Sequence, residues 1–194
     1  MAMGNRKKPV TRLTRDDWVQ AALNMLAGGG IAAVRVSTIA TDLGITTGSF
    51  YHHFKDKKEL FHEMLEFWFK SSTTEVRADI TALELDGIQS LQTLHRLIEH
   101  RRATSFDVAI RSWALHDPTA QEVVAKTDNV RLEFIRKQFR KIGFEGLDLE
   151  NRSRLFLYYE TMSLAFFDRP DEETAQQLNE IRMNFLTARP ENPI

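Results

Sequence analysis

The sequence predicts an all-α protein of about nine helices. Apolar residues recur at the helical spacing of about 3.6 through most of the chain, and capping signals precede many of these segments. We find no convincing alternation of apolar and polar residues, which is the pattern that would predict strands. Residues 34–60 organise the chain, because two short predicted helices are separated there by a glycine.

Composition narrows the class of protein. Of the 194 residues, 42% are hydrophobic and 27% charged, which is typical of a soluble globular protein. There is no cysteine, hence no disulfide framework and no thiolate chemistry, which fits a cytoplasmic protein. We expect neither a signal peptide nor a membrane-spanning helix. The basic residues 1–10 precede no apolar core, and no apolar run approaches the ~20 residues that cross a bilayer.

Positive charge is concentrated at one end of the chain, although the net charge is only −1. Residues 1–60 contain nine Lys or Arg against five Asp or Glu, whereas the remainder contains 17 against 22. Such a separation indicates that the N-terminal end binds phosphates. Residues 1–10 are predicted to be a disordered basic arm, which either stays solvated or touches DNA.

The first predicted helix covers the back of the organising stretch. Thr14 and Asp17 form a capping-box signal before it, and Gly28 to Gly30 end it. Its apolar stripe consists of Trp18, Ala21, Ala22, Met25 and Leu26.

Two short helices follow. A short helix with Ile39, Ala40 and Leu43 on one face should end at Gly44, because a residue without Cβ adopts the left-handed turn with little strain. Thr46 can then cap a second helix from Thr47 to His53. Asp56, with a glutamate three residues later, is the capping-box signal for a third helix. A helix, a glycine turn and a short helix are the parts of a helix-turn-helix, whose second helix enters the DNA major groove.

Several residues of this stretch agree in type and spacing with a known family. They are Ile39-Ala40, Gly44-Ile45, Gly48, Tyr51, Phe54, Lys57 and Leu60. With them, residues 11–71 resemble the DNA-binding domain of TetR-type transcriptional regulators. The resemblance implies a helix-turn-helix at about residues 34–53 and a ligand-binding and dimerisation domain in residues 72–194.

The candidate DNA-binding residues are Arg35, Ser37, Thr46, Thr47, Gly48, Ser49, Tyr51, His52, His53 and Lys57. The Thr47 and Ser49 hydroxyls can bond base edges, and the resemblance implies that Thr47 and Gly48 face bases. It implies phosphate contacts for Tyr51, for the two histidines after it and for Lys57, which lies at a helix N-terminus that attracts anions. The alternative is that Tyr51 is only a packed aromatic, although it shares a helix face with Thr47.

Position 35 departs from the family pattern. TetR-type sequences usually have Ser or Thr there to cap the next helix, whereas the Arg35 side chain cannot accept that hydrogen bond. Either the helix begins uncapped near Val36, or Ser37 caps it one turn late.

The helix that begins at Asp56 is expected to be long. Its core stripe consists of Leu60, Phe61, Met64, Leu65 and Trp68. It should continue to about Ile80, beyond what a small DNA-binding domain can cover. We expect the surplus to pack on the second domain and to link the two mechanically.

Later helices are placed by their capping signals. The predicted caps are Asp86, Asp117 and Asp148. Pro118 marks the first position of one helix and Gly143 its end, while Pro170 and acidic residues open the last helix. Asp107 and Arg111 are predicted to form an ion pair at i, i+4.

Residues 154–167 are apolar on nearly every face of a helix. Such a helix must be buried on all sides, either inside a monomer or between its own domain and a partner. With the last helix it resembles the dimerisation pair of TetR-type proteins, and a two-fold operator favours a homodimer. The candidate interface residues are Phe166, Leu178, Ile181 and Phe185.

A ligand pocket is implied by the resemblance rather than by particular residues. The candidate lining residues are Phe67, Trp113, Tyr158, Tyr159 and Met162. They are large, aromatic or flexible and suit an apolar or aromatic ligand. The alternative is that each of them is an ordinary core residue.

The sequence contains no recognisable catalytic, metal or cofactor site. Adjacent helical residues such as His52 and His53 point apart, and no zinc motif completes them. We therefore expect a cytoplasmic homodimeric regulator, a repressor released from a palindromic DNA operator by a small molecule. Two alternatives remain open. One is a dimeric DNA-binding protein without ligand control, and the other is an all-α ligand-binding protein or enzyme that keeps a helix-turn-helix.

Overall fold

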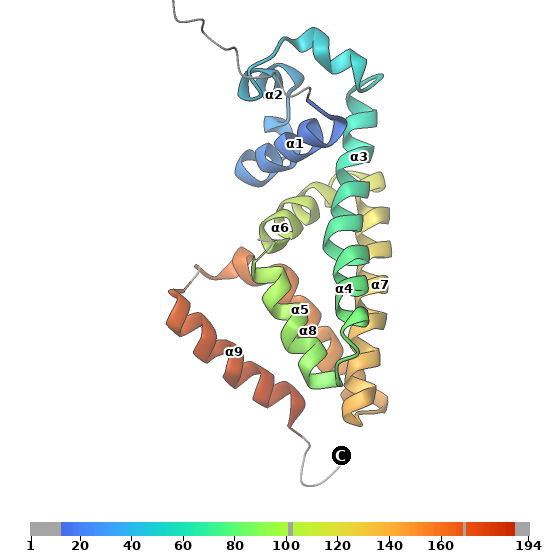
Figure 1. Ribbon diagram of the computed structural model, residues 1–194, viewed down its shortest axis with the longest axis vertical. Helices are drawn as coiled ribbons and strands as arrows, with labels where there is room; N and C mark the ends of the chain where they lie inside the picture. The colour runs from blue at the N-terminus through green and yellow to red at the C-terminus, as the bar shows by residue number, and fades with distance from the viewer. Residues whose placement is uncertain (1–12, 101–102, 169, 189–194) are drawn as a thin grey trace, which may run out of the picture.

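The computed structural model describes residues 13–100, 103–168 and 170–188, which fold into helices joined by short turns (Figure 1). The α-helices are α1 (Arg15–Gly29), α2 (Val36–Asp42), α3 (Lys57–Phe69), α4 (Glu75–Ala82), α5 (Gly87–His100), α6 (Ala103–Ala114), α7 (Pro118–Ile142), α8 (Gly146–Phe166) and α9 (Glu172–Thr187). These ranges contain nine α-helices and no strand, which confirms the predicted fold class. No helix in them is both long and apolar enough to cross a membrane. The basic arm predicted at residues 1–10 lies outside them.

Several helices begin and end where their capping residues predict. The Thr14 hydroxyl accepts a hydrogen bond from the Asp17 N–H, while the Asp17 carboxylate accepts one from the Thr14 N–H at 2.7 Å. Asp117 caps α7 by accepting from the Ala120 N–H, and Gly143 ends that helix at φ +100°. Local side-chain chemistry therefore sets these helix boundaries.

The predicted cap at Asp148 is wrong. α8 begins at Gly146, and the side chain of its N-cap residue Glu145 makes no capping bond. Because Gly146 adopts φ +57°, the chain turns into the helix early and leaves Asp148 in the first turn. There it pairs with Arg152 Nε at 2.7 Å, and its charge still favours the helix N-terminus.

The predicted long helix is divided in two. α3 and α4 are joined by a short π-helix at Lys70–Thr74, which we call the π-turn. α4 then reaches Ala82, beyond the predicted end at about Ile80. The Ser71 and Ser72 hydroxyls bond carbonyls four residues earlier, so they compete with the backbone for these acceptors and favour a wider turn. Figure 1 shows α3 and α4 in one line, with α7 alongside.

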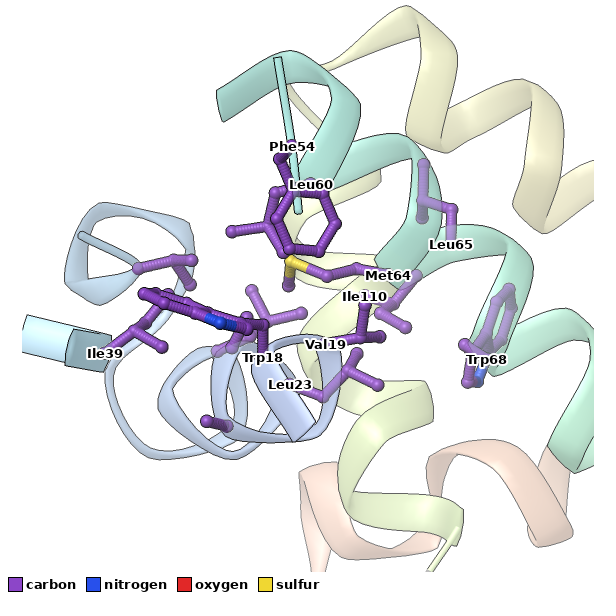
Figure 2. Close-up of a cluster of buried hydrophobic side chains, with 14 of the residues drawn as sticks. Trp18, Val19, Leu23, Ile39, Phe54, Leu60, Met64, Leu65, Trp68 and Ile110 are labelled. Atoms are coloured by element: carbon purple, nitrogen blue, oxygen red, sulfur yellow. The ribbon is translucent and has the colours of Figure 1, made fainter. Parts of the chain in front are cut away.

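The first hydrophobic cluster lies between α1, α2 and α3 (Figure 2). Its large members Trp18, Phe54 and Trp68 are at most 2% exposed. Ile110 and Trp113 of α6 also belong to it. The first hydrophobic cluster therefore contains residues from both sides of the domain boundary predicted between residues 71 and 72. The boundary itself stays a prediction.

The second hydrophobic cluster joins α4, α5, α7, α8 and α9. Its centre contains Leu91, Phe139 and Phe156, none of which is exposed. At Gly87, a Cβ would lie 2.5 Å from the Gln138 carbonyl oxygen, so glycine lets α5 begin in direct contact with α7.

Candidate nucleic-acid interface and adjoining cavity

The turn between the two short helices forms as predicted, and the second of them is a 3-10 helix rather than an α-helix. Gly44 adopts φ +69°, which reverses the chain immediately after α2. The helix Thr47–His52, which we call the recognition segment, is a 3-10 helix, one residue shorter than predicted. The predicted cap at Thr46 does not form, because the Ser49 N–H that it would use bonds the Thr46 carbonyl at 3.0 Å.

The ten candidate DNA-binding residues lie between the start of α2 and the start of α3. Eight of them are exposed, namely Arg35, Ser37, Thr46, Thr47, Gly48, Tyr51, His52 and Lys57. Ser49 and His53 are half-buried, and the centre of the His53 ring lies 6.4 Å from that of Trp18. The structure therefore brings the predicted set together on one exposed part of the chain.

α2 begins uncapped, which is the first of the two alternatives for position 35. The helix starts at Val36, and Arg35 before it makes no capping bond. Its Nε donates instead to the Ala32 carbonyl at 3.3 Å. Ser37 is exposed in the first turn, so it stays available to a partner.

The aromatic residues of this region divide between core and surface. Phe50 and Phe54 are 1% and 2% exposed, and their ring centroids lie 5.2 Å apart. Tyr51 meets Phe50 edge-on but is 69% exposed. The predicted orientation of the segment is confirmed, and Tyr51 is not simply a packed aromatic.

A largely buried arginine holds the π-turn between α3 and α4. Arg131 of α7 donates from Nε to the Thr73 hydroxyl at 2.9 Å and from Nη2 to the Ser72 hydroxyl at 2.7 Å. Its Nη1 binds the Asp107 carboxylate of α6 at 2.7 Å, and its guanidinium lies 5.1 Å from the Trp68 ring. Burial raises the pKa of Asp107, and the charge of Arg131 opposes that rise. The sequence does not reveal this group, because the partners of Arg131 lie 24 to 59 residues away from it.

The predicted ion pair between Asp107 and Arg111 does not form. Arg111 binds the Asp128 carboxylate of α7 through both Nη atoms, at 2.7 and 2.5 Å. Bidentate pairing of this kind is stronger than a single contact along one helix. Both residues therefore connect α6 to α7 rather than to each other.

A small cavity lies beside Arg131. Its volume is about 30 Å³, which suits about two waters rather than a ligand of ordinary size. The lining residues include Thr73, Leu94, Asp107, Arg131, Phe156 and Glu160. The cavity thus adjoins the π-turn as well as the second hydrophobic cluster.

The five predicted pocket residues are not among those that line this cavity. Phe67 and Trp113 pack in the first cluster, where Trp113 is 6% exposed. Tyr158 is 57% exposed, and the Tyr159 ring lies 3.5 Å from an arginine of α9. Met162 is half-buried on α8. Helical periodicity identified large side chains, but it could not show which of them face a common space.

A second buried polar group connects α5, α8 and α9. His95 Nδ1 lies 3.0 Å from both carboxylate oxygens of Glu160, and each residue is 4% exposed. Arg182 Nη2 lies 3.2 Å from the same nitrogen. Across the described ranges, no group of three or more His, Cys, Asp or Glu side chains could hold a metal ion.

The apolar residues of α8 and α9 are only partly covered in one chain. The exposed fractions are 73% for Phe166, 47% for Leu178, 67% for Ile181 and 71% for Phe185. Met183 and Leu186, on another side of α9, are buried in the second cluster. The alternative in which residues 154–167 are enclosed within a monomer is therefore wrong.

Comparison with known proteins agrees with this geometry. Residues 19–64 match the model of the family described as bacterial regulatory proteins, tetR family. The chain is 42% identical over 107 residues to the HTH-type transcriptional repressor KstR2 of Mycolicibacterium smegmatis, covering 53% of this chain and 51% of that protein. It is 29% identical over 138 residues to KstR2 of Mycobacterium tuberculosis H37Rv, covering 69% and 64%. The match thus spans about half of the first relative and just under two thirds of the second.

Solved structures share the fold over nearly the whole chain. The structure of the ketosteroid transcriptional regulator KstR2 of Mycobacterium tuberculosis has a TM-score of 0.68 at 20% identity, covering 92% of this chain and 97% of that one. The TetR family regulator PfmR of Thermus thermophilus has a TM-score of 0.70 at 21% identity, covering 94% and 100%. At these identities the likeness concerns the fold.

Proposed function

This chain belongs to the tetR family of bacterial regulatory proteins, and we propose that it is a homodimeric DNA-binding repressor released from a palindromic operator by a small molecule. The observation that carries the proposal is the recognition segment, whose small polar residues are largely exposed directly after the turn at Gly44. The relatives named above are transcriptional regulators rather than enzymes. The protein would act in the cytoplasm, where bacterial operators lie.

The exposed residues suggest a division between base and phosphate contacts. Thr47, Gly48 and Ser49 begin the recognition segment and would meet base edges in the major groove. Tyr51, the two histidines after it and Lys57 would bind phosphates. Lys57 is the first residue of α3, where unpaired backbone N–H groups add to its attraction for an anion. The DNA backbone beside these contacts would be bound by Arg35, Ser37 and Thr46.

Gly48 supports a close approach of the chain to DNA. Its φ lies outside the left-handed region, and a Cβ added there would meet the Thr46 hydroxyl at 3.8 Å, which is an ordinary contact. Nothing within the described part of the chain therefore requires glycine at this position. A base edge or phosphate pressed against the backbone would require it.

The open apolar face of α8 and α9 supports a homodimer. Phe166, Ile181 and Phe185 are each about two thirds exposed or more, which is unusual for such large apolar side chains on neighbouring helices. A second copy would bury the same face by two-fold symmetry. The same symmetry would place two recognition segments in successive major grooves of a palindromic operator.

Ligand control would act through α6 and the π-turn. Asp107 of α6 lines the cavity, while Ile110 and Trp113 of the same helix pack in the first cluster. A ligand larger than the ~30 Å³ cavity needs a more open conformer, so it would shift the population toward that conformer. Parting Arg131 from Asp107 would free both α6 and the π-turn. α3 would then carry the recognition segments out of register with the grooves.

The ligand is proposed to be apolar or aromatic, because the cavity walls are largely side chains such as Val76, Leu94 and Phe156. A relative of known structure is named a ketosteroid transcriptional regulator, so ketosteroids belong among the first compounds tested. The small cavity favours the second candidate function, a dimeric DNA-binding regulator without ligand control.

Selection of bound DNA from random duplexes tests the proposal. We expect an enriched palindrome whose half-site centres are about 10 base pairs, or a multiple of that, apart. Repeating the selection with apolar and aromatic compounds should weaken the enrichment for at least one class of compound. A palindrome that no compound affects would favour the ligand-free regulator. The absence of any enriched sequence would contradict sequence-specific binding.

A further inference from the structure

The recognition segment cannot keep a fixed orientation without contacts from the rest of the chain. It is a 3-10 helix of six residues without a side-chain cap at its start, and helices of this kind and length are weak in isolation. Base recognition nevertheless requires that its side chains meet the groove at a fixed angle. Contacts from the rest of the chain must therefore fix the segment.

Arg15, the first residue of α1, reaches the far end of this segment. Its Nη1 donates to the His53 carbonyl oxygen at 2.6 Å, directly after the last residue of the 3-10 helix. Its guanidinium lies 4.6 Å from the centre of the Phe54 ring, which stacks on Phe50 of the segment. A guanidinium at a helix C-terminus satisfies carbonyls that have no partner within the helix.

The same guanidinium also binds α3. Nη2 lies 2.5 Å from the Glu59 carboxylate and 3.0 Å from that of Glu63. Glu59 in turn accepts the Lys55 N–H at 2.6 Å, so the predicted capping box at Asp56 forms only in half. Asp56 accepts from the Glu59 N–H, but the Glu59 side chain is bound to Lys55 and Arg15 instead. One side chain thus joins α1, the end of the recognition segment and α3.

The charge around Arg15 argues against a phosphate contact. Arg15 counts among the nine positive residues of the N-terminal end, so composition alone suggests that it binds DNA. Two carboxylates already neutralise it, and a phosphate brought to the same guanidinium would be repelled by both. The hydrogen bond with Glu59 raises the pKa of Arg15, and the Lys55 N–H and Arg15 lower that of Glu59, so the pair stays charged near neutral pH.

We propose that Arg15 is a positioning residue for DNA recognition, which fixes the angle of the recognition segment against α1 and α3 without touching DNA. The proposal rests on the proposed function. It assigns a role in sequence preference to a side chain that none of the predicted DNA contacts includes. It also distinguishes this arginine from Lys57, whose ammonium is exposed and has no carboxylate partner among the ion pairs of the described residues.

Substitution by lysine separates positioning from charge. Arg15→Lys keeps the positive charge but cannot bond a carbonyl and two carboxylates in one planar fork. We expect it to lower affinity for the selected palindrome by about tenfold or more, as for the loss of a base contact. Affinity for unrelated DNA and the salt dependence of log K should stay at wild-type values. Arg136→Lys is the matched control, because Arg136 binds Glu133 and Glu150 far from the segment and should change neither affinity.

Glu59→Gln separates the two possible roles of Arg15, because they predict opposite changes in DNA binding. If Arg15 acts only through charge, removal of the Glu59 carboxylate reduces repulsion and strengthens binding to every DNA. If Arg15 positions the segment, the same change weakens binding to the palindrome selectively. A phosphate role, and therefore the failure of the proposal, would appear as wild-type behaviour of Arg15→Lys. In that case Arg15→Met would weaken all DNA binding and flatten the salt slope by about one unit per subunit.

Hydrogen exchange tests the proposal without DNA. In the free protein, Arg15→Lys should speed exchange of the amides in residues 49–54 by about tenfold and leave those in the centre of α3 unchanged. Unchanged rates at residues 49–54 would overturn the positioning role. A wild-type protein that binds no DNA would contradict the proposed function, while the exchange rates would still decide the role of Arg15.

Discussion

Residues 13–71 and residues 72–188 differ in what they bury and in what they expose. Among the residues that the structure describes, every buried polar or charged side chain lies in the second region, from Thr73 to Thr161. In the first region, Tyr51 is the one exposed large hydrophobic residue of the described part, whereas the second region has eleven. The first region is thus packed within one chain, and the second has polar groups inside and an apolar face outside.

This difference suits the two regions to different tasks, one to rigid recognition and the other to a change of conformation. An apolar core packs densely and tolerates little rearrangement, which suits a surface that must match a groove. Largely buried charge pairs such as Asp107 and Arg131 have discrete partners and strongly disfavour intermediate states, which suits an element with two arrangements. The open face of α8 and α9 adds a dependence on a second chain.

The strongest test of this comparison removes the second chain. Phe166→Glu combined with Phe185→Glu would place carboxylates in the proposed interface, so we expect monomers or aggregates and the loss of operator binding. Sedimentation and operator titration at micromolar protein measure both effects. Leu83→Glu, at an exposed corner between α4 and α5, is the control and should stay dimeric. A monomeric wild type would remove the contrast between the two regions.

The next test breaks the buried pair at the π-turn. Arg131→Met leaves Asp107 without its partner, so the free energy of unfolding should fall by about 3–5 kcal/mol. The control Arg136→Met removes ion pairs with Glu133 and Glu150, which are more exposed than Asp107, and should lower it clearly less than Arg131→Met does. Urea unfolding at pH 7 measures both. Equal losses would mean that the buried group has no special role.

Within the first region, two substitutions should differ in kind. Lys57→Ala should weaken binding equally on good and poor operators and flatten the salt dependence of log K by about one unit per subunit. Thr47→Ala should keep the salt slope and relax preference at one or two symmetric base positions, by about 1–3 kcal/mol. Salt titrations on both kinds of operator measure this. The reverse pattern would mean that the proposed placement of the recognition segment in the groove is wrong.

The smallest expected effects lie in the pH dependence of stability. Burial raises the pKa of Asp107 above 3.8, so the native state holds this proton more tightly and stability should fall as pH rises from about 4 toward neutral. Hydrogen bonds from Arg136 and then Arg154 lower the pKa of Glu150 to about 2, so its contribution should be lost as pH falls from 4.5 to about 2. Asp107→Asn should flatten the first slope and Glu150→Gln the second. Unfolding curves across pH would show identical profiles if neither group is linked to folding.

The sequence by itself determined the features that depend on near neighbours in the chain. Thr14, Gly44, Asp117 and Gly143 act on backbone groups within about four residues, so their effects could be predicted from spacing alone. The same local logic predicted the turn at Gly44 and the burial of Phe50 and Phe54 with Tyr51 on another face. It failed at Thr46 and Asp148, where a neighbouring hydrogen bond or a left-handed glycine changed the start of the helix.

Only the tertiary structure decided the roles of Arg15, Arg131 and Asp107. Each was one charged residue among many in the sequence, and their partners lie between 24 and 59 residues away. Periodicity shows which side of a helix is buried, but not which helix packs against it. The π-turn, the cavity and the Arg15 contacts arise where side chains from three elements meet, and that meeting depends on how the whole chain packs.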